Sequence, residues 1–354
     1  MNPTITIGSR IIGLGHPTYI VAEMSANHNK DFNQAAKIME VAKEVGADAV
    51  KLQTYTPDTM TIDCDNEYFL IKGTLWDGRT LYDLYREACT PWDWQPKLKE
   101  IAGGLGLDLF STPFDHTAVD FLETLGMPAY KISSFENVDL PLLRKIAQTG
   151  KPIIMSTGMA TLAEIEEAVR TIRKAGGNQL ALLKCTSAYP APVEELNLHT
   201  IAHLANAFSV PVGLSDHTLS SVMPVAAVAL GACIIEKHFT LSRAVQGPDS
   251  GFSLEPAEFK AMVETVRITE QALGKVHYGA SEREALSRVF RRSLFVVQDM
   301  QAGERFTTDN IRSIRPAYGL HTRHLEEVIG RHATKDIKRG TPLSWDLVGG
   351  NRVR

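Results

Sequence analysis

Between about residues 19 and 273 the chain alternates two hydrophobic patterns. Short apolar runs rich in β-branched residues recur, and each precedes a longer stretch in which apolar residues return with a helical period. The short runs are 19–25, 49–55, 108–113, 130–134, 152–157, 180–186, 212–216 and 233–239. The helical stretches include 32–45, 118–125, 140–149, 162–175, 198–207, 222–230 and 256–273. Buried strands that alternate with helices indicate a parallel sheet.

Eight strand–helix units over about 250 residues predict an α/β fold of the closed (β/α)8 type, a TIM barrel. An open, doubly wound sheet is the alternative, but it needs no eighth strand and usually begins with a Gly-rich turn that is missing here. A long insertion, 57–91, follows the second strand, and we expect it to cover the active face as a lid rather than to be a decorative surface loop.

The pattern changes after residue 273. A charged, helical connector leads to short β-prone runs at 293–297, 311–315 and 333–337, separated by glycine-containing turns. We therefore predict a barrel domain over 1–280, a linker over 281–291 and a small β-rich domain over 292–354.

Composition and charge exclude some function classes. The net charge of −4 gives no overall basic field for nucleic acid. From residue 288 to the end, 13 basic and 7 acidic residues give a net charge of +6, so the rest carries −10. This asymmetry suggests docking onto an acidic body or an anionic ligand, although a solvated basic surface is an equal alternative. We expect four free cysteines, no secretion signal, no membrane span and a cytoplasmic location.

Each predicted strand ends in polar residues where an apolar run would normally pass into a loop. In a (β/α)8 barrel these ends meet at one face and supply the catalytic groups. Burying eight polar clusters without a ligand would be costly. We therefore predict that they line one site: Glu23, Lys51, Gln53, Thr112, Lys131, Ser134, Glu136, Ser156, Ser187, Tyr189, Ser215, His217, Glu236 and His238.

Alternation along the strands refines this prediction. Residues two apart point to the same side, so Lys51 and Gln53 point together, as do Glu236 and His238. His217 and His238 follow neighbouring strands, and two imidazoles with open positions are typical of a site for Mn²⁺, Zn²⁺, Fe²⁺ or Co²⁺.

Lys131 and the nearby hydroxyls could hold the phosphate of a small molecule. A phosphorylated small molecule is favoured over a nucleotide, because no Gly-rich nucleotide-binding loop is present.

These residues stand in motifs that resemble the sialic acid synthase family along essentially the whole chain. The motifs are AEMSANHN (22–29), VKLQT (50–54), STPF (111–114), KISSFE (131–136), MSTGM (155–159), GLSDHT (213–218), IEKHFT (235–240) and GPD (247–249). The tail, with IRPAYG at 314–319, resembles the antifreeze-like (SAF) domain of that family.

The resemblance implies condensation of phosphoenolpyruvate with an amino sugar. It implies that phosphoenolpyruvate is held by Thr112, Lys131, Ser134, Ser156, Ser187 and Ser215. It implies that His217 and His238, with Glu136 close by, bind Mn²⁺, Mg²⁺ or Co²⁺. Sugar binding and proton transfer would fall to Glu23, Lys51, Gln53, Glu136, Tyr189, Glu236 and Asp249. A domain-swapped homodimer would bring Arg315 to the sugar in the partner's barrel.

Within the family, the chain resembles the pseudaminic acid synthases. The resemblance rests on GTLWDGRTLYDLY (73–85), TPW (90–92) and LKCTSAYP (183–190). It implies a 6-deoxy diacetamido hexose, 2,4-diacetamido-2,4,6-trideoxy-altrose, whose methyl group Leu75 or Trp76 could contact.

Four alternatives remain open. The chain could be an N-acetylneuraminate or legionaminic acid synthase, or a Schiff-base aldolase with Lys131 or Lys237 as nucleophile. It could also be a non-catalytic carbohydrate-binding barrel. A phosphoenolpyruvate-condensing barrel of aromatic biosynthesis would leave the tail unexplained.

Overall fold

The computed structural model describes residues 2–350, which divide between Gly274 and Lys275 into two compact units. The domain limits at residues 280 and 291 stay predictions, and residues 351–354 of the predicted second domain lie outside the described part. Each unit has its own hydrophobic core.

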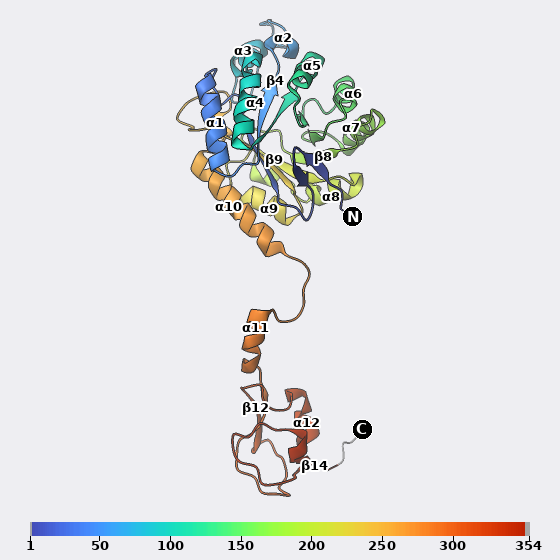
Figure 1. The fold of residues 1–354 in the computed structure, drawn as a ribbon, viewed down its shortest axis with the longest axis vertical. Coiled ribbons are helices and arrows are strands. Elements are labelled where there is room, and N and C mark those ends of the chain that lie inside the picture. Colours follow the sequence, from blue (N-terminus) through green and yellow to red (C-terminus); the bar gives the residue numbers. More distant parts are fainter. Residues whose placement is uncertain (1, 351–354) are drawn as a thin grey trace. The chain divides into compact units, whose positions relative to one another are not determined.

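Eight parallel strands form a closed barrel in the first unit (Figure 1). They are β3 (Tyr19–Glu23), β4 (Ala49–Thr54), β5 (Asp108–Pro113), β6 (Tyr130–Ile132), β7 (Ile153–Ser156), β8 (Leu180–Cys185), β9 (Val212–Asp216) and β10 (Ile234–His238). Each strand pairs with the next in the chain, and β10 closes the ring by pairing with β3. The predicted barrel and all eight of its strands are confirmed.

Helices connect the strands and surround them. They are α1 (Phe32–Glu44), α4 (Gln95–Leu105), α5 (His116–Leu125), α6 (Leu140–Gln148), α7 (Leu162–Lys174), α8 (Thr200–Phe208), α9 (Val222–Ala229) and α10 (Pro256–Leu273). Side chains at the N-termini satisfy otherwise unpaired backbone N–H groups, as Thr161 and Glu164 do in the capping box of α7. The predicted helices are confirmed within a few residues.

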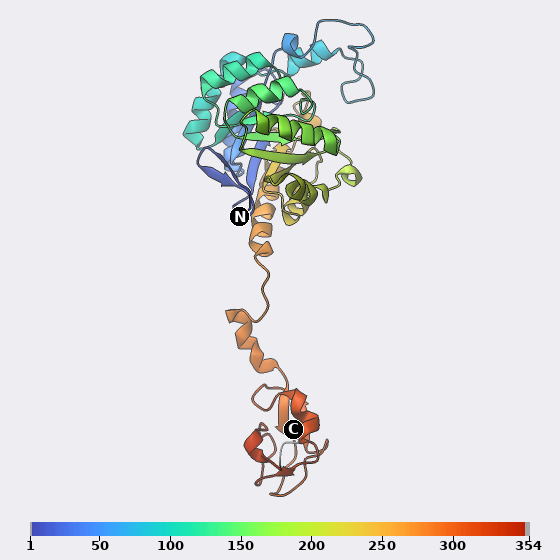
Figure 2. The same cartoon turned by 90° about the vertical axis from the view of Figure 1, so that its right-hand side faces the viewer.

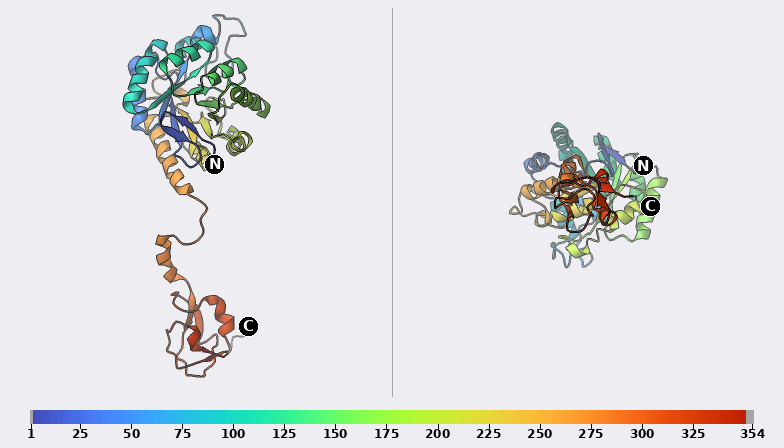
Figure 3. Two further views of the ribbon diagram at one scale, coloured as in Figure 1. Left: turned by 45° about the vertical axis from the view of Figure 1, so that its right-hand side comes forward. Right: turned by 90° about the horizontal axis from the view of Figure 1, so that it is seen from below.

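Strand alternation separates two apolar layers. One face of each strand packs against the helices and forms the large core. The other face fills the barrel interior, where Val21, Phe110 and Ile154 join Ile5, Ile7 and Ile12. These three isoleucines belong to the antiparallel hairpin of β1 (Ile5–Ile7) and β2 (Arg10–Ile12), which lies at the end of the barrel opposite the 57–91 insertion (Figure 3). The sequence patterns did not predict this hairpin, because three-residue strands are too short to show a period.

The insertion 57–91 is structured and lies at one end of the barrel, drawn in light blue in Figure 2. It contains α2 (Pro57–Met60) and α3 (Leu81–Ala88). The segment before α3 doubles back on itself, with a bridge between Leu70 and Thr80. The ring of Tyr55, just after β4, meets Tyr85 of α3 at 5.8 Å and thereby attaches the insertion to the barrel.

The described part of the second unit has five short helical segments and four short strands. They are α11 (Glu282–Leu286), η4 (Ser287–Phe290), β11 (Ser293–Val296), β12 (Ile311–Ile314), η5 (Thr322–His324), α12 (Leu325–Val328), β13 (His332–Ala333), η6 (Trp345–Leu347) and β14 (Val348–Gly349). Further 3-10 turns along the chain are η1 (Trp92–Trp94), η2 (Val193–Glu195) and η3 (Ser250–Phe252). The predicted run at 333–337 forms a strand only at its start, since β13 pairs with β14 for two residues.

All four cysteines carry free thiols, as predicted. Within residues 2–350, no helix has both the length and the apolar character that crossing a bilayer requires.

Close packing of the barrel predicts a strong effect at Gly213 in β9. A Cβ atom there would lie 2.3 Å from the Ile234 carbonyl oxygen and 2.6 Å from the Ile234 Cβ. Gly213→Ala should therefore lower the free energy of unfolding by about 1–3 kcal/mol in urea titrations. Gly104→Ala, on α4 with no atom within 4 Å of the added methyl, is the matched control and should be neutral or stabilising. Equal stability of both variants would contradict this account.

Candidate functional site

The polar residues at the strand ends continue the inward face of the barrel. Above the apolar interior layer, the same alternation turns Glu23, Lys51, Lys131 and Glu236 inward, and all four are at most 5% exposed. The predicted residues of the first unit lie on or directly after the barrel strands, except for Asp249, which lies in the loop after β10.

Two lysines and two glutamates form one buried charge cluster. Lys51 Nζ lies 2.7 Å from Glu23 Oε2 and 3.7 Å from Glu236 Oε1. Lys131 Nζ lies 3.8 Å from the same oxygen of Glu236. The cluster balances its own charge, which buried ions require.

The two buried carboxyls have pKa values shifted in opposite directions. Burial raises the pKa of Glu23, where the attraction of Lys51 only partly offsets it. Glu236 is equally buried, but Lys131 and Lys51 outweigh that burial and lower its pKa. Burial also lowers the pKa of Lys131. Two carboxyls whose pKa values are driven apart can take different proton-transfer roles.

A chain of hydrogen bonds links Glu23 to Asp249. Gln53 Nε2 donates to Glu23 Oε1 and to Ser25 Oγ, both at 2.9 Å. Ser25 Oγ donates to the Asp249 carboxylate, which also accepts from the Ala26 N–H at 3.2 Å. The loop after β10 is therefore joined to the ends of β3 and β4.

The predicted phosphate-binding hydroxyls contact the charge cluster on its other side. Lys131 Nζ donates to Ser156 Oγ at 2.7 Å, Lys51 Nζ to Thr112 Oγ1 at 3.3 Å, and Ser215 Oγ to Glu236 Oε1 at 3.1 Å.

Ser134 and Ser187 meet at Gly158. The Gly158 N–H donates to Ser134 Oγ at 3.1 Å. A Cβ on Gly158 would lie 2.3 Å from Ser187 Oγ and 2.7 Å from Ser134 Oγ. Both hydroxyls can lie this close to the backbone only because residue 158 has no side chain.

His217 and His238 face each other, with ring centroids 5.4 Å apart. His217 Nδ1 lies 2.9 Å from the Thr186 carbonyl oxygen, so that nitrogen carries a proton and Nε2 is the ring nitrogen left to bind an ion. Burial would lower the pKa of His217, but the charge of Cys185 and its hydrogen bond to the imidazole outweigh burial and raise the pKa. His238 Nδ1 is buried and has no hydrogen-bond partner among residues 2–350. Burial, with the charge of His217, lowers the pKa of His238 and keeps its imidazole neutral. The pair fits two ligands of a divalent ion, although no group of three or more His, Cys, Asp or Glu within that range could hold one.

Aromatic rings surround the two imidazoles. The Tyr189 ring lies 4.3 Å from that of His217, and the Phe252 ring lies 4.9 Å from that of His238. Burial raises the pKa of Tyr189, so its hydroxyl stays protonated.

Three predicted residues stand apart from these contacts. Glu136 bonds to Ser133, and no contact joins it to either imidazole within the described residues. Lys237 faces the opposite side of β10, where Asp216 pairs with it at 2.5 Å. Arg315 is exposed in the second unit.

Sequence reasoning missed Ser25 and Cys185 as site residues. Ser25 has a left-handed backbone, with φ of 46°, which its sequence neighbours do not reveal. Cys185 is the last residue of β8 and faces inward by the same alternation that placed its neighbours. Burial would raise the pKa of its thiol, but His217 outweighs burial and lowers it to about 7.

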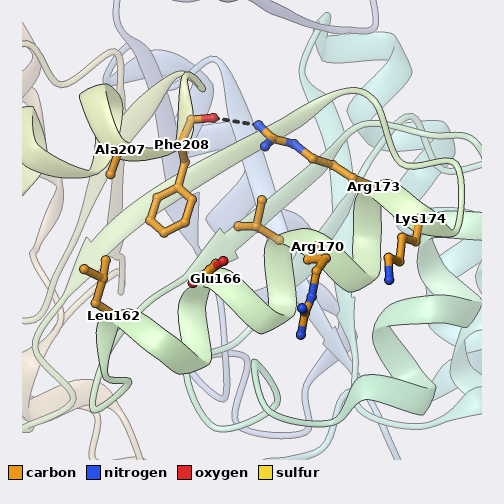
Figure 4. A pocket seen from close by; sticks show the side chains of 8 residues that line it. Leu162, Glu166, Arg170, Arg173, Lys174, Ala207 and Phe208 are labelled. Atoms are coloured by element: carbon orange, nitrogen blue, oxygen red, sulfur yellow. Dashed lines mark hydrogen bonds between the residues drawn. The ribbon is translucent and has the colours of Figure 1, made fainter.

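A groove of about 480 Å³ lies elsewhere, on the outer helices (Figure 4). Residues of α7 and of the end of α8 line it, and Arg173 donates across it to the Phe208 carbonyl at 2.6 Å. None of the predicted site residues lines this groove.

The sequence and the fold are similar to those of known nonulosonic acid synthases. Residues 38–278 match the NeuB family, and residues 291–349 match the SAF domain. The chain is 47% identical to the pseudaminic acid synthase of Helicobacter pylori, over 93% of this chain and 97% of that one. It is 40% identical to the N,N'-diacetyllegionaminic acid synthase of Campylobacter jejuni, over 91% and 97% of the two chains. Among solved structures, the N-acetylneuraminic acid synthetase of Leptospira borgpetersenii aligns with a TM-score of 0.73 and 31% identity, over 81% and 95% of the two chains.

The raised pKa of the Glu136 carboxyl leads us to expect that the stability of the protein depends on pH. Burial raises its pKa from 4.5 to about 7, with the charge of Lys131 acting in the opposite direction. The folded state therefore holds a proton that the unfolded chain releases, and this contribution is lost as the pH rises through about 7. The loss should be at most about 3 kcal/mol between pH 4.5 and 8. In urea titrations Glu136→Gln should flatten this slope, whereas the exposed Glu166→Gln should leave it unchanged. An unaltered slope in the Glu136 variant would refute the assignment.

Proposed function

Because the chain belongs to the NeuB family and carries its SAF domain, we propose that it is a pseudaminic acid synthase. The reaction joins phosphoenolpyruvate to 2,4-diacetamido-2,4,6-trideoxy-β-L-altropyranose and yields pseudaminic acid and phosphate. The observation that carries the proposal is the buried cluster of two lysines and two glutamates beside a facing pair of imidazoles.

Phosphoenolpyruvate would bind on the hydroxyl-rich side of this cluster. Lys131 supplies a positive charge to the phosphate or carboxylate, and Thr112, Ser134, Ser156, Ser187 and Ser215 supply neutral donors. The low exposure of Lys131, 2%, supports this role, because a desolvated ammonium group attracts an anion strongly.

His217 and His238 would hold the divalent ion, Mn²⁺, Mg²⁺ or Co²⁺. The orphaned Nδ1 of His238 and the fixed tautomer of His217 support this assignment. When bound, the ion would supply Lewis-acid polarisation of the sugar aldehyde.

The chain's own groups would direct bond formation and proton transfer. C3 of phosphoenolpyruvate attacks the aldehyde carbon, the new alkoxide takes a proton, water adds at C2, and phosphate leaves. Glu23, whose pKa is raised by burial, is suited to deliver that proton, with Gln53 and Lys51 holding its two oxygens. Glu236, which stays ionised, can orient the water.

Asp249, Tyr189 and Glu136 would complete the sugar side of the site. Asp249 is held by Ser25 and Ala26 and could accept hydrogen bonds from sugar hydroxyls or amides. Tyr189 keeps its proton and can donate one. Arg315 would act from the partner subunit of a domain-swapped homodimer, and the basic tail of the chain supports such docking. We place the enzyme in the cytoplasm, where phosphoenolpyruvate is made.

Asp216 engages Lys237 on the outer face of the strand, which disfavours it as a Schiff-base nucleophile, so that alternative rests on Lys131 alone. The complete charge cluster disfavours a non-catalytic barrel.

The decisive experiment incubates the protein with phosphoenolpyruvate and a panel of hexosamines and measures phosphate release. The 6-deoxy diacetamido altrose should be the best substrate, and preference for N-acetylmannosamine or the legionaminic acid precursor would refute the proposal. Borohydride with pyruvate should trap no adduct.

Metal removal should abolish activity. After EDTA treatment, phosphate release should fall at least a hundredfold and return with Mn²⁺, because the aldehyde loses its polarising ion. His238→Ala should prevent this recovery, while His203→Ala, exposed on α8, should behave like the unchanged protein. Full activity in the stripped protein would rule out the metal role.

Gly158→Ala should weaken phosphoenolpyruvate binding specifically. The new methyl group would displace the hydroxyls of Ser134 and Ser187. Loss of one or two hydrogen bonds should raise the KM for phosphoenolpyruvate about tenfold, with a smaller change in the KM for the sugar. Gly104→Ala serves as the control. A changed KM for the sugar alone would instead assign these serines to the sugar.

A further inference from the structure

An aromatic wall stands on one side of the candidate site, formed by Trp76, Tyr189 and Phe252. Tyr189 is its centre, because its ring lies 5.9 Å from that of Trp76, 5.0 Å from that of Phe252 and 4.3 Å from that of His217. Trp76 comes from the insertion 57–91, whereas the other two residues follow β8 and β10. The insertion therefore reaches the imidazoles through the ring of Tyr189.

Trp76 is held by a defined turn. Around it, the N–H of Ile71 donates to the Arg79 carbonyl at 2.9 Å, and the N–H of Gly78 donates to the Ile71 carbonyl at 3.0 Å. Gly78 has a φ of 80°, a conformation that glycine adopts without strain. Such a turn fixes where the indole points.

The polar atom of the indole is already occupied. Trp76 Nε1 donates to the Pro248 carbonyl oxygen at 2.9 Å. Pro248 directly precedes Asp249, whose carboxylate is bonded to Ser25. The bond ties the insertion to the loop that carries Asp249, and the remaining surface of the ring is apolar.

We propose that Trp76 is a specificity-determining residue, whose indole packs against the C6 methyl group of the sugar. This inference rests on the proposed function. With the aldehyde at the imidazoles, the far end of the six-carbon chain points away from them, and Tyr189 separates them from Trp76. The hydroxyls and Lys131 are assigned to phosphoenolpyruvate, which leaves the aromatic rings to the sugar.

The same geometry explains rejection of a 6-hydroxyl group. A hydroxyl facing the indole would lose its water without gaining a partner from the ring, because the single N–H of Trp76 already donates to the Pro248 carbonyl. A site that leaves a polar group unpaired discriminates more strongly than a mere difference in size. Removing the indole would take away the apolar surface and leave the Pro248 carbonyl without its Trp76 donor, so a substrate hydroxyl could donate to it.

The test compares two substrates that differ only at C6: 2,4-diacetamido-2,4,6-trideoxy-altrose and its 6-hydroxy counterpart. The measured quantity is the ratio of their kcat/KM values, from phosphate release with saturating phosphoenolpyruvate. Trp76→Ala should reduce the preference for the 6-deoxy sugar at least tenfold, and Trp76→Phe should keep part of it. The KM for phosphoenolpyruvate should not change.

Leu75→Ala is the matched control, since Leu75 is in the same turn but is 59% exposed. It should leave the ratio unchanged, and thermal denaturation should show that each variant is folded. If Trp76→Ala slows both sugars equally, or leaves the ratio intact, the specificity role is overturned while the proposed function stands. If the unchanged protein converts neither sugar, the proposed function itself fails.

Discussion

Lys51 lies between two buried carboxylates, and the rest of the site is arranged around this contact. Its ammonium group is 2.7 Å from Glu23 and 3.7 Å from Glu236, and the residue is 5% exposed. Burial would lower the pKa of Lys51, but the two carboxylates outweigh it and raise the pKa. Removing one partner from such a cluster typically costs about 3–5 kcal/mol, because a buried charge is left uncompensated. Such buried charges are tolerated only where the strand ends bring all the oppositely charged partners together.

The interior of the barrel is divided into an apolar layer and a charged layer, and this division positions the charged side chains. Isoleucines of the N-terminal hairpin and apolar strand residues fill one end. Two residues further along the same strands, the inward side chains become charged. The polar layer is therefore supported from below by a packed apolar layer, and its side chains have little freedom to move. Rigid support of this kind is what preorganised electrostatics requires.

The opening of the site has two chemically different sides. Hydroxyls and Lys131 form one side, and aromatic rings from the insertion and from the loops after β8 and β10 form the other. The imidazoles lie close to the aromatic side and contact both Tyr189 and Phe252. The anionic three-carbon substrate and the partly apolar sugar of the proposed reaction differ in polarity in the same way as these two groups of side chains.

The sequence by itself determined the barrel, since eight repeats of an apolar run and a helical period leave few other topologies. It also determined which polar residues face inward, because alternation along a strand is a local property. Only the tertiary structure decided the contacts between segments. Ser25 reaches Asp249 across 224 positions, and Trp76 reaches Pro248 across 172. Ser134 and Ser187, which come from different strand ends, both lie next to Gly158. Such contacts depend on loop conformations and on packing between distant segments, which no short-range hydrophobic period encodes.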